Sequence, residues 1–348
     1  MDIKTLHTLD TQQPADCLEW CTHPDFPHHF ICGTYHLEEG ETDFSQPPTR
    51  RIGRIYLYKY DMYLDDLELL DTIETAAILD AKWLIVSNKC LLIAASALSE
   101  ILVYELKNDD RLHLVDSINL ASDGDENLLT LAIDVRGSVG SGSMHTENLI
   151  ASDSRGMVSL LTVKHNKIVK ERTWKAHSFE AWTCAFDKWN PNVVYTGGDD
   201  TFMHVYDIRA PDVQQTIKNK CHIAGVTSFL SFSENCLITG SYDEYLRIFD
   251  TRSWRQPVTD LQLFGGIWRI KPSKCNRKLL LCACMYKNFS VCRINDDHNE
   301  LKLIAEFNKH ESICYGADWA PNRLCNGGQV MITCSFYDKK LCISSVHE

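Results

Sequence analysis

The chain has 348 residues, 44% of them hydrophobic and 24% charged, which is the composition of a folded protein large enough to bury a full core. Its formal net charge of −12 disfavours nucleic acid as the main partner. The excess of acids fits a basic partner, although an acidic surface can equally serve only to keep the chain soluble.

The N-terminal residues and the cysteine usage predict an intracellular protein. Residues 1–4 lack the charged and apolar regions of a signal peptide, and the apolar stretch at 91–98 is too short to span a bilayer. Fifteen scattered cysteines, many of them inside apolar runs, show neither zinc-ligand spacing nor a disulfide framework. We therefore expect reduced thiols, no metal, no membrane partner and a cytoplasmic location, with the nucleus as a further compartment.

The predicted elements are strands throughout. Helical periodicity is almost absent, and short β-rich runs separated by turn residues predict an all-β fold. In the first half, inner strands are predicted near 16–20, 76–83 and 128–135, and second strands at 30–35, 91–96 and 149–153. Two segments, 36–50 and 137–147, lengthen turns and are expected to be mobile surface loops. The glycines of the second segment open no helix, so a phosphate-binding loop is rejected.

The second half repeats a unit of constant length. First strands are predicted to begin near 181, 225, 266 and 313, and these spacings match the ~40–45-residue period of four-stranded WD-repeat blades. Tyr206-Asp207 and Phe249-Asp250 end the third strands of two units, in place of the Trp-Asp pair typical of WD repeats.

The two chain ends are predicted to complete one blade together. The last unit has only three strands, the third at 341–346, and residues 3–9 supply the missing outer strand, which leaves no open sheet edge. We therefore predict a single all-β domain, 1–348, folded as a seven-bladed WD-repeat β-propeller closed by the N-terminal strand. The blades are expected near 16–72, 76–119, 127–175, 181–217, 225–263, 266–307 and 313–346 plus 3–9.

Histidine and aspartate residues recur at fixed places in these units. A His before the inner strand commonly joins a hydrogen-bond network with an Asp in the turn after the second strand, which satisfies buried polar groups. The pairs in this position are His177 with Asp200, His222 with Asp243, and His310 with Asp338. We expect these pairs to be structural.

Residues beside the networks are candidates for a binding site. Aligning the inner strands places Trp182, Trp268 and Tyr315 near the mouth of the central channel, with Asp16 and Thr227 at the same level. Aromatic rings and carboxylates around one funnel suit a quaternary ammonium, because a desolvated cation gains ~2 kcal/mol from aromatic faces. Ordinary packing of strand aromatics is the alternative interpretation. Glu180, Asp199 and Tyr242, in the adjoining loops and turns, are expected at the same end of the channel.

Common enzyme motifs are absent from the sequence. There is no GxSxG, no HExxH, and no GxGxxG between a strand and a helix. These absences disfavour an α/β-type serine hydrolase, a zinc protease and a Rossmann-type methyltransferase.

Several strings nevertheless resemble one family, the diphthine methyl ester hydrolases, which are WD-repeat proteins of diphthamide biosynthesis. The most specific are His-Ser-Phe-Glu-Ala-Trp at 177–182, Gly-Gly-Ile-Trp-Arg-Ile-Lys at 265–271 and Tyr-Gly-Ala-Asp-Trp at 315–319. Further strings lie at 15–20, 32–35, 77–83, 195–200 and 240–244, so the resemblance covers almost the whole chain.

The resemblance implies a substrate and a reaction. Members of the family act on a histidine of elongation factor 2 whose modified side chain carries a trimethylammonium group. They hydrolyse its methyl ester to diphthine and methanol, and no cofactor is implied. Elongation factor 2 is therefore the expected partner of a monomeric enzyme, and a non-catalytic WD-repeat scaffold is the alternative.

A mechanistic hypothesis follows for the channel mouth, with every residue role still to be tested. Water would attack the ester carbonyl, with Glu180 or Asp199 as general base near His177. Arg269 or Tyr242 would stabilise the oxyanion. The residues expected to hold the cation are Trp182, Trp268, Tyr315 and Asp16.

Overall fold

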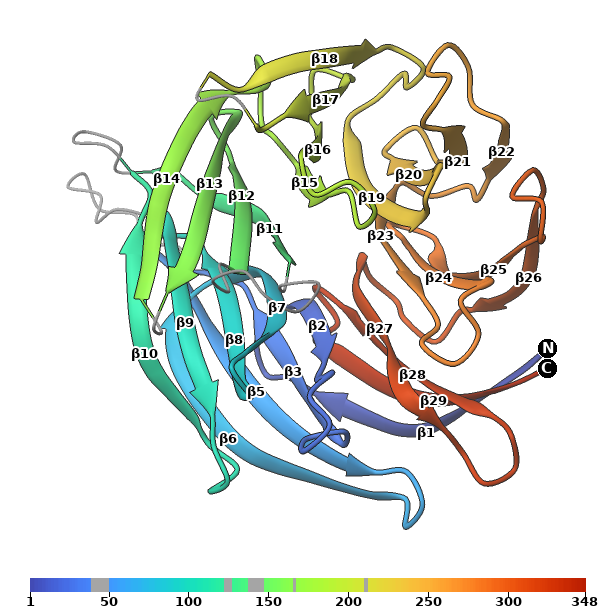
Figure 1. Cartoon of the computed structure of the whole chain (residues 1–348). Helices are drawn as coiled ribbons and strands as arrows, with labels where there is room; N and C mark the ends of the chain where they lie inside the picture. Colours follow the sequence, from blue (N-terminus) through green and yellow to red (C-terminus); the bar gives the residue numbers. More distant parts are fainter. Residues whose placement is uncertain (39–49, 122–126, 137–146, 165–166, 210–211) are drawn as a thin grey trace, which may run out of the picture.

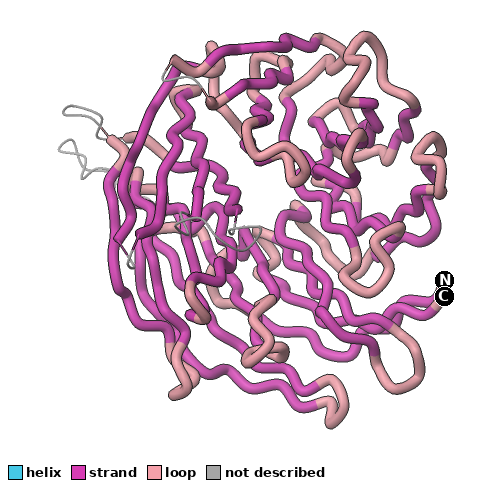
Figure 2. Tube along the Cα trace, in the orientation of Figure 1, coloured by secondary structure: helices cyan, strands magenta, loops and turns pink. Residues whose placement is uncertain are grey.

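The computed structural model describes residues 1–38, 50–121, 127–136, 147–164, 167–209 and 212–348. Within these ranges the chain forms strands, turns and loops and contains no helix (Figure 2). None of the described residues therefore belongs to a helix that could cross a membrane. Of the two predicted mobile loops, 36–50 and 137–147, residues 39–49 and 137–146 lie outside the described residues. Residues 36–38, 50 and 147 belong to paired strands and not to loops, so the prediction was wrong at these positions.

Seven antiparallel sheets stand around a central channel, so the predicted all-β, seven-bladed propeller is confirmed (Figure 1). Blade 1 contains β2 (Ala15–Trp20), β3 (His29–Thr34), β5 (Arg50–Asp61) and β6 (Asp66–Ala76), with the short β4 (His36–Glu38) paired to β5. Blade 2 contains β7 (Ile78–Val86), β8 (Lys89–Ser96), β9 (Glu100–Leu106) and β10 (Leu112–Asn119). Blade 3 contains β11 (Thr130–Arg136), β12 (Glu147–Asp153), β13 (Met157–Lys164) and β14 (Lys167–Lys175).

The second half is built in the same way, from the channel outwards. Blade 4 contains β15 (Thr183–Phe186), β16 (Val193–Gly197), β17 (Met203–Asp207) and β18 (Gln214–Asn219). Blade 5 contains β19 (Val226–Ser233), β20 (Cys236–Ser241), β21 (Tyr245–Asp250) and β22 (Thr259–Gln262). Blade 6 contains β23 (Ile267–Pro272), β24 (Leu279–Cys284), β25 (Asn288–Ile294) and β26 (Leu301–Phe307). Blade 7 contains β27 (Cys314–Arg323), β28 (Gln329–Ser335), β29 (Lys340–His347) and β1 (Asp2–Asp10).

Blade 7 closes the ring with both ends of the chain. Strand β1 pairs antiparallel with β29, from Asp2 opposite His347 to Asp10 opposite Lys340. Figure 1 accordingly shows the two termini side by side. Strand β1 comes from the N-terminus and the other three strands of blade 7 come from the C-terminus. The ring therefore cannot open without breaking the hydrogen bonds between β1 and β29.

The hydrophobic core consists of layers between neighbouring blades. Strands in the middle of a blade are covered on both faces, so β20, β24 and β28 are buried at every residue. The outermost strands alternate instead, as β1 does, because one face meets solvent. All fifteen cysteines are free thiols, and twelve of them are buried.

The predicted His–Asp networks are present in three forms. His177 Nδ1 lies 2.8 Å from Asp200 Oδ1, and its Nε2 lies 2.8 Å from Thr196 Oγ1. In blade 5, Arg247 Nη1 bridges the pair, 3.0 Å from His222 and 2.8 Å from Asp243. In blade 7, Ser335 takes the bridging place between His310 and Asp338.

A second set of aspartates links blades inside the channel. Backbone N–H groups of Trp20, Ile133 and Phe186 donate to the carboxylates of Asp318, Asp80 and Asp134, at 2.8, 3.1 and 2.8 Å respectively. Each aspartate sits on the inner strand of one blade and its donor on the inner strand of the next. These bonds fix the inner strands that carry the channel side chains.

Candidate active site at the channel mouth

All inner strands begin at the same end of the channel, which we call the upper end. In an up-and-down blade, the loop entering the inner strand and the turn after the second strand both reach this end. Asp16, Trp182, Trp268 and Tyr315 stand at or just before the starts of their inner strands, as predicted from the repeat alignment. Tyr242 lies at the same end, in the turn between β20 and β21 of blade 5.

The aromatic side chains of this mouth pack against one another. The ring of Trp182 lies 5.9 Å from that of Trp268 and 6.0 Å from that of Tyr242, both in edge-to-face arrangement. Trp268 and Tyr315 are 5.2 Å apart, and Phe336 extends the cluster from Tyr315 at 5.5 Å. Phe336 is not among the site residues predicted from the sequence. Its place in the turn after β28, equivalent to that of Tyr242, was the available signal.

These ring distances leave no open cage between the indoles. A cation binds within about 6 Å of a ring centroid, and it cannot fit between two rings whose own centroids are 5.9 Å apart. One face of Trp268 also meets a resident cation, because Arg269 Cζ lies 5.5 Å from its ring. A ligand cation would therefore lie over the outward faces of the cluster.

Two polar groups at the mouth lack partners. Trp268 Nε1 is buried and has no hydrogen-bond partner among the described residues. Asp16 is 7% exposed, and no hydrogen bond within the described part of the chain reaches its carboxyl group. Burial raises the pKa of Asp16 to about 8, against the opposing attraction of Arg269. An unpaired donor and an unpaired carboxyl group at one mouth are typical of a ligand site.

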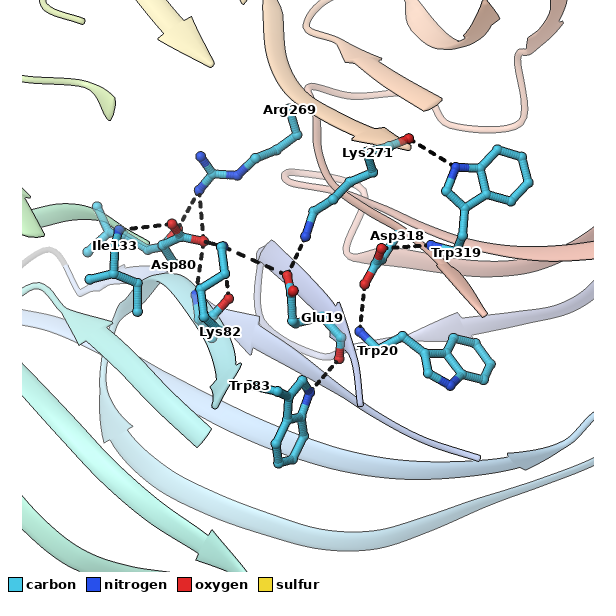
Figure 3. A network of polar contacts seen from close by, with 12 residues as sticks. Glu19, Trp20, Asp80, Lys82, Trp83, Ile133, Arg269, Lys271, Asp318 and Trp319 are labelled. Atoms are coloured by element: carbon cyan, nitrogen blue, oxygen red, sulfur yellow. Dashed lines mark hydrogen bonds and ion pairs between the residues drawn. The ribbon is translucent and has the colours of Figure 1, made fainter. Parts of the chain in front are cut away.

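Arg269 connects the mouth to a chain of buried ion pairs (Figure 3). Its Nη2 lies 3.3 Å from Asp80 Oδ1, and Lys82 Nζ lies 2.7 Å from the same oxygen. Lys82 and Lys271 in turn share Glu19, the latter through a hydrogen bond. Burial would raise the pKa of Asp80, but Arg269 and Lys82 hold it below its usual value.

Of these charged residues, only Arg269 was predicted from the sequence to belong to the site. The available signal was the presence of the charged residues Glu19, Lys82 and Lys271 at matching positions of three inner strands. Below the aromatic cluster, Asp80 and Arg269 help to line a cavity of about 410 Å³ that extends toward the lower end of the channel. The aromatic residues of the mouth are not part of its lining.

The two candidate bases, Asp199 and Glu180, and the neighbouring His177 occupy different environments. Asp199 Oδ1 accepts a hydrogen bond of 2.9 Å from Trp182 Nε1, and Gly225 allows this contact because a Cβ there would lie 2.9 Å from the same oxygen. Glu180 is partly exposed, and its side chain makes no hydrogen bond with any described residue. His177 is buried, with both ring nitrogens used by Asp200 and Thr196.

His177 consequently makes no hydrogen bond to Glu180 or Asp199 within the described chain. The geometry supports the structural role that the repeat pattern predicted for His177, and it gives no contact through which His177 could orient a base. Tyr242 and Arg269 both reach the mouth, but only Arg269 lies close enough to influence Asp16 strongly.

The fold defines a WD-repeat propeller, and the residues at one end of its channel form a candidate ligand site. The WD40 family model (WD domain, G-beta repeat) matches residues 213–250. A chain in the crystal structure of the mitotic checkpoint complex aligns with 99% of this chain, over 92% of its own length, with a TM-score of 0.71 at 14% identity, which shows the fold alone.

Two relatives that are at least 30% identical over most of this chain share one name. The human protein named diphthine methyltransferase is 34% identical, over 90% of this chain and 74% of its own length. The Schizosaccharomyces pombe protein of that name is 30% identical, over 96% and 95%. The chain therefore belongs to the diphthine methyltransferase family of WD-repeat proteins.

Proposed function

We propose that this protein hydrolyses the methyl ester of methylated diphthine on elongation factor 2, a step of diphthamide biosynthesis. The observation that carries the proposal is the buried carboxyl group of Asp16 beside Arg269 and the unbonded indole N–H of Trp268. A carboxyl group with a pKa near 8 is a competent base near neutral pH, and the guanidinium of Arg269 and the free indole N–H of Trp268 are donors of the kind that stabilises a developing oxyanion.

The reaction needs only water and these side chains. The carboxylate of Asp16 takes a proton from water as its oxygen attacks the ester carbonyl carbon. The tetrahedral oxyanion accepts hydrogen bonds from Arg269 and from Trp268 Nε1. The carbon–methoxy bond then breaks, and the proton passes from Asp16 to the departing methoxide, which leaves as methanol. The resulting carboxylic acid releases its remaining proton to water and stays on diphthine as a carboxylate.

Asp16 thus takes the role that the sequence suggested for Glu180 or Asp199. The carboxylate of Asp199 is already engaged by Trp182, so its role is to hold that ring. The trimethylammonium group would lie over the outward faces of Trp182 and Tyr242, within the field of Asp199 and Glu180. The ester on the same side chain would then point toward Trp268 and Arg269.

The name shared by the relatives specifies methyl transfer rather than hydrolysis. A transferase must also bind a methyl donor, and the described strands and loops offer neither a helix N-terminus nor a glycine-rich strand–helix turn for that purpose. Asp16, Arg269 and Trp268 have the character of an ester-hydrolysing set. This contrast favours the hydrolase.

The rim of the mouth suits a protein substrate. Large apolar side chains project from upper-end loops and turns of blades 4–7, namely Phe179, Ile223, Phe264, Tyr286 and Tyr337. Tyr337 joins this rim to the site, because its ring lies 5.0 Å from that of Phe336.

Two of these side chains are held in a strained backbone. Tyr286 (φ 57°) is 80% exposed and Phe264 (φ 60°) is 64% exposed. A left-handed conformation costs a bulky residue about 1 kcal/mol or more, and neither aromatic ring regains it by burial in the free protein. We assign the rim to docking of the elongation factor around its modified histidine.

Mass spectrometry of elongation factor 2 carrying methylated diphthine, before and after incubation with the purified protein and no cofactor, tests the proposal. Loss of one methylene mass with release of methanol is the expected result. An Asp16→Asn variant that is folded but inactive provides the control. An unchanged mass with the protein folded and bound to the factor would favour the scaffold. A mass gain that requires an added methyl donor would favour the transferase.

A further inference from the structure

The cavity beneath Asp80 and Arg269 opens toward the lower end of the channel, away from the aromatic mouth. Lys188 follows β15, and Lys274 and Arg277 follow β23, so these three cations stand at the ends of inner strands. None of the three belongs to the proposed hydrolytic set. The cavity therefore needs an explanation of its own.

The charges lining this cavity do not balance. Its cationic side chains are Lys82, Lys188, Arg269, Lys271, Lys274 and Arg277. Its carboxylates are Glu19, Asp80, Asp134 and Asp318. Six cations against four carboxylates leave an excess of two positive charges inside a chain whose net charge is −12.

Three of the four carboxylates are already neutralised by cations. Glu19 pairs with Lys271 and Lys82, and Asp80 pairs with Arg269 and Lys82. Asp318 lies 3.2 Å from Lys274. The fourth, Asp134, accepts the backbone N–H of Phe186, and burial raises its pKa.

Two cations remain without a carboxylate partner in the described chain. Lys188 Nζ makes neither an ion pair nor a hydrogen bond there, and Arg277 donates only to the backbone oxygen of Phe232, at 2.8 Å. Burial lowers the pKa of Lys188, and although Asp134 opposes this, Arg277 and Lys271 lower it further. Like charges held together in a partly enclosed space attract a multivalent anion.

We propose that the lower half of the channel binds a small multivalent oxyanion of the phosphate class between Lys188 and Arg277. An ammonium and a guanidinium together offer up to eight N–H donors, and Arg277 has already committed one of them. Several oxygens of one tetrahedral anion can accept the rest. The cavity of about 410 Å³ has room for such an anion with its water.

Thermal unfolding with added sodium pyrophosphate tests this site without using the hydrolase reaction. At saturation, pyrophosphate should raise the melting temperature by about 2–4 °C beyond sodium chloride of equal ionic strength. The double variant Lys188→Gln/Arg277→Gln should lose that increase. The double variant Lys107→Gln/Arg111→Gln removes the same charge from an exposed turn of blade 2 and should keep it.

Direct titration calorimetry then separates binding from stability. We expect affinity for pyrophosphate to fall at least about tenfold in the lower-channel double variant, and Lys188→Arg, which keeps the charge, to retain most of it. Equal affinity in both double variants would overturn the site. An equal increase of the melting temperature in sodium chloride of the same ionic strength would also overturn the site. Because neither readout involves ester hydrolysis, failure here leaves the proposed function untouched, and the reverse also holds.

Discussion

The guanidinium of Arg269 lies 3.3 Å from the carboxylate of Asp80, and both side chains are largely buried in the channel. Asp80 also accepts the backbone N–H of Ile133, on the inner strand of blade 3. The same carboxylate therefore holds two blades together and positions the guanidinium that faces Asp16. This ion pair therefore contributes to the packing of the blades and, in the proposed mechanism, holds the oxyanion donor in place.

Arg269→Gln should impair both properties. Asp80 keeps Lys82 at 2.7 Å but loses Arg269, and breaking a buried ion pair by removing one partner costs up to about 3–5 kcal/mol. Loss of an oxyanion donor should lower kcat by about 10²–10³-fold. Thermal unfolding and methanol release measure the two effects. Arg269→Lys keeps the charge, should remain folded, and should still lose most of kcat. Full activity in the Lys variant would exclude Arg269 as a geometrically specific donor.

Asp16 should impose a pH dependence on hydrolysis. The base form must be present, and burial raises the pKa of Asp16 to about 8, so kcat/KM should rise with pH and level off above about 8. Asp16→Asn should abolish this rise and lower kcat by at least about 100-fold. A matched Asp199→Asn variant should keep the same pH profile. If the two substitutions had interchanged effects, the base would be Asp199.

The same carboxyl group should destabilise the fold at high pH. Its folded pKa of about 8 lies above the ordinary value of 3.8, so the folded state retains a proton that the unfolded state has released. The contribution of Asp16 to stability is thus intact below pH 3.8 and declines as pH rises toward 8. Asp16→Asn should therefore be more stable than the natural chain at pH 8, by on the order of 1–3 kcal/mol. Unfolding in urea at pH 5 and pH 8 measures the difference, and an equal gain at both values would contradict it.

The fold could be predicted from the sequence because each blade repeats the same physical signals. The His and Asp of blade 4, at 177 and 200, and the Gly-Gly pair between them mark one unit, and a spacing of 41–47 residues locates each following unit. The inner strands of the second half begin at Thr183, Val226, Ile267 and Cys314, against predicted starts near 181, 225, 266 and 313.

The site was only partly predictable. Alignment of the inner strands gives the position of a residue along the channel axis but not its contact partners. It brought Asp16, Trp182 and Trp268 to one end. It could not reveal that the indoles contact each other or that Asp199 is engaged by Trp182, because those contacts depend on rotamers. The pairing of Arg269 with Asp80 joins blades 6 and 2 across the channel, a relationship that no local pattern contains.

Tyr286 should act in docking rather than in chemistry. Tyr286→Gly removes a strained, exposed aromatic side chain, so the fold should stay equally stable or gain up to about 1 kcal/mol. KM for modified elongation factor 2 should rise several-fold with kcat unchanged. Tyr63→Gly, which removes an exposed tyrosine at the opposite end of blade 1, is the matched control and should leave KM unaltered. Identical KM values for the two variants would remove the rim from the docking surface.

Two substitutions of Trp268 separate the role of its aromatic ring from the role of its indole N–H. Trp268→Phe keeps an aromatic face but removes the buried N–H that has no partner among the described residues. If that N–H meets the oxyanion, kcat should fall by about 10–100-fold while KM changes by less than about twofold. Trp268→Ala should in addition raise KM, because the ring that supports Trp182 and Tyr315 is gone. Steady-state kinetics on modified elongation factor 2 separates the two variants. A Phe variant with normal kcat would leave Trp268 as a wall of the site, and Arg269 would then be the principal donor to the oxyanion.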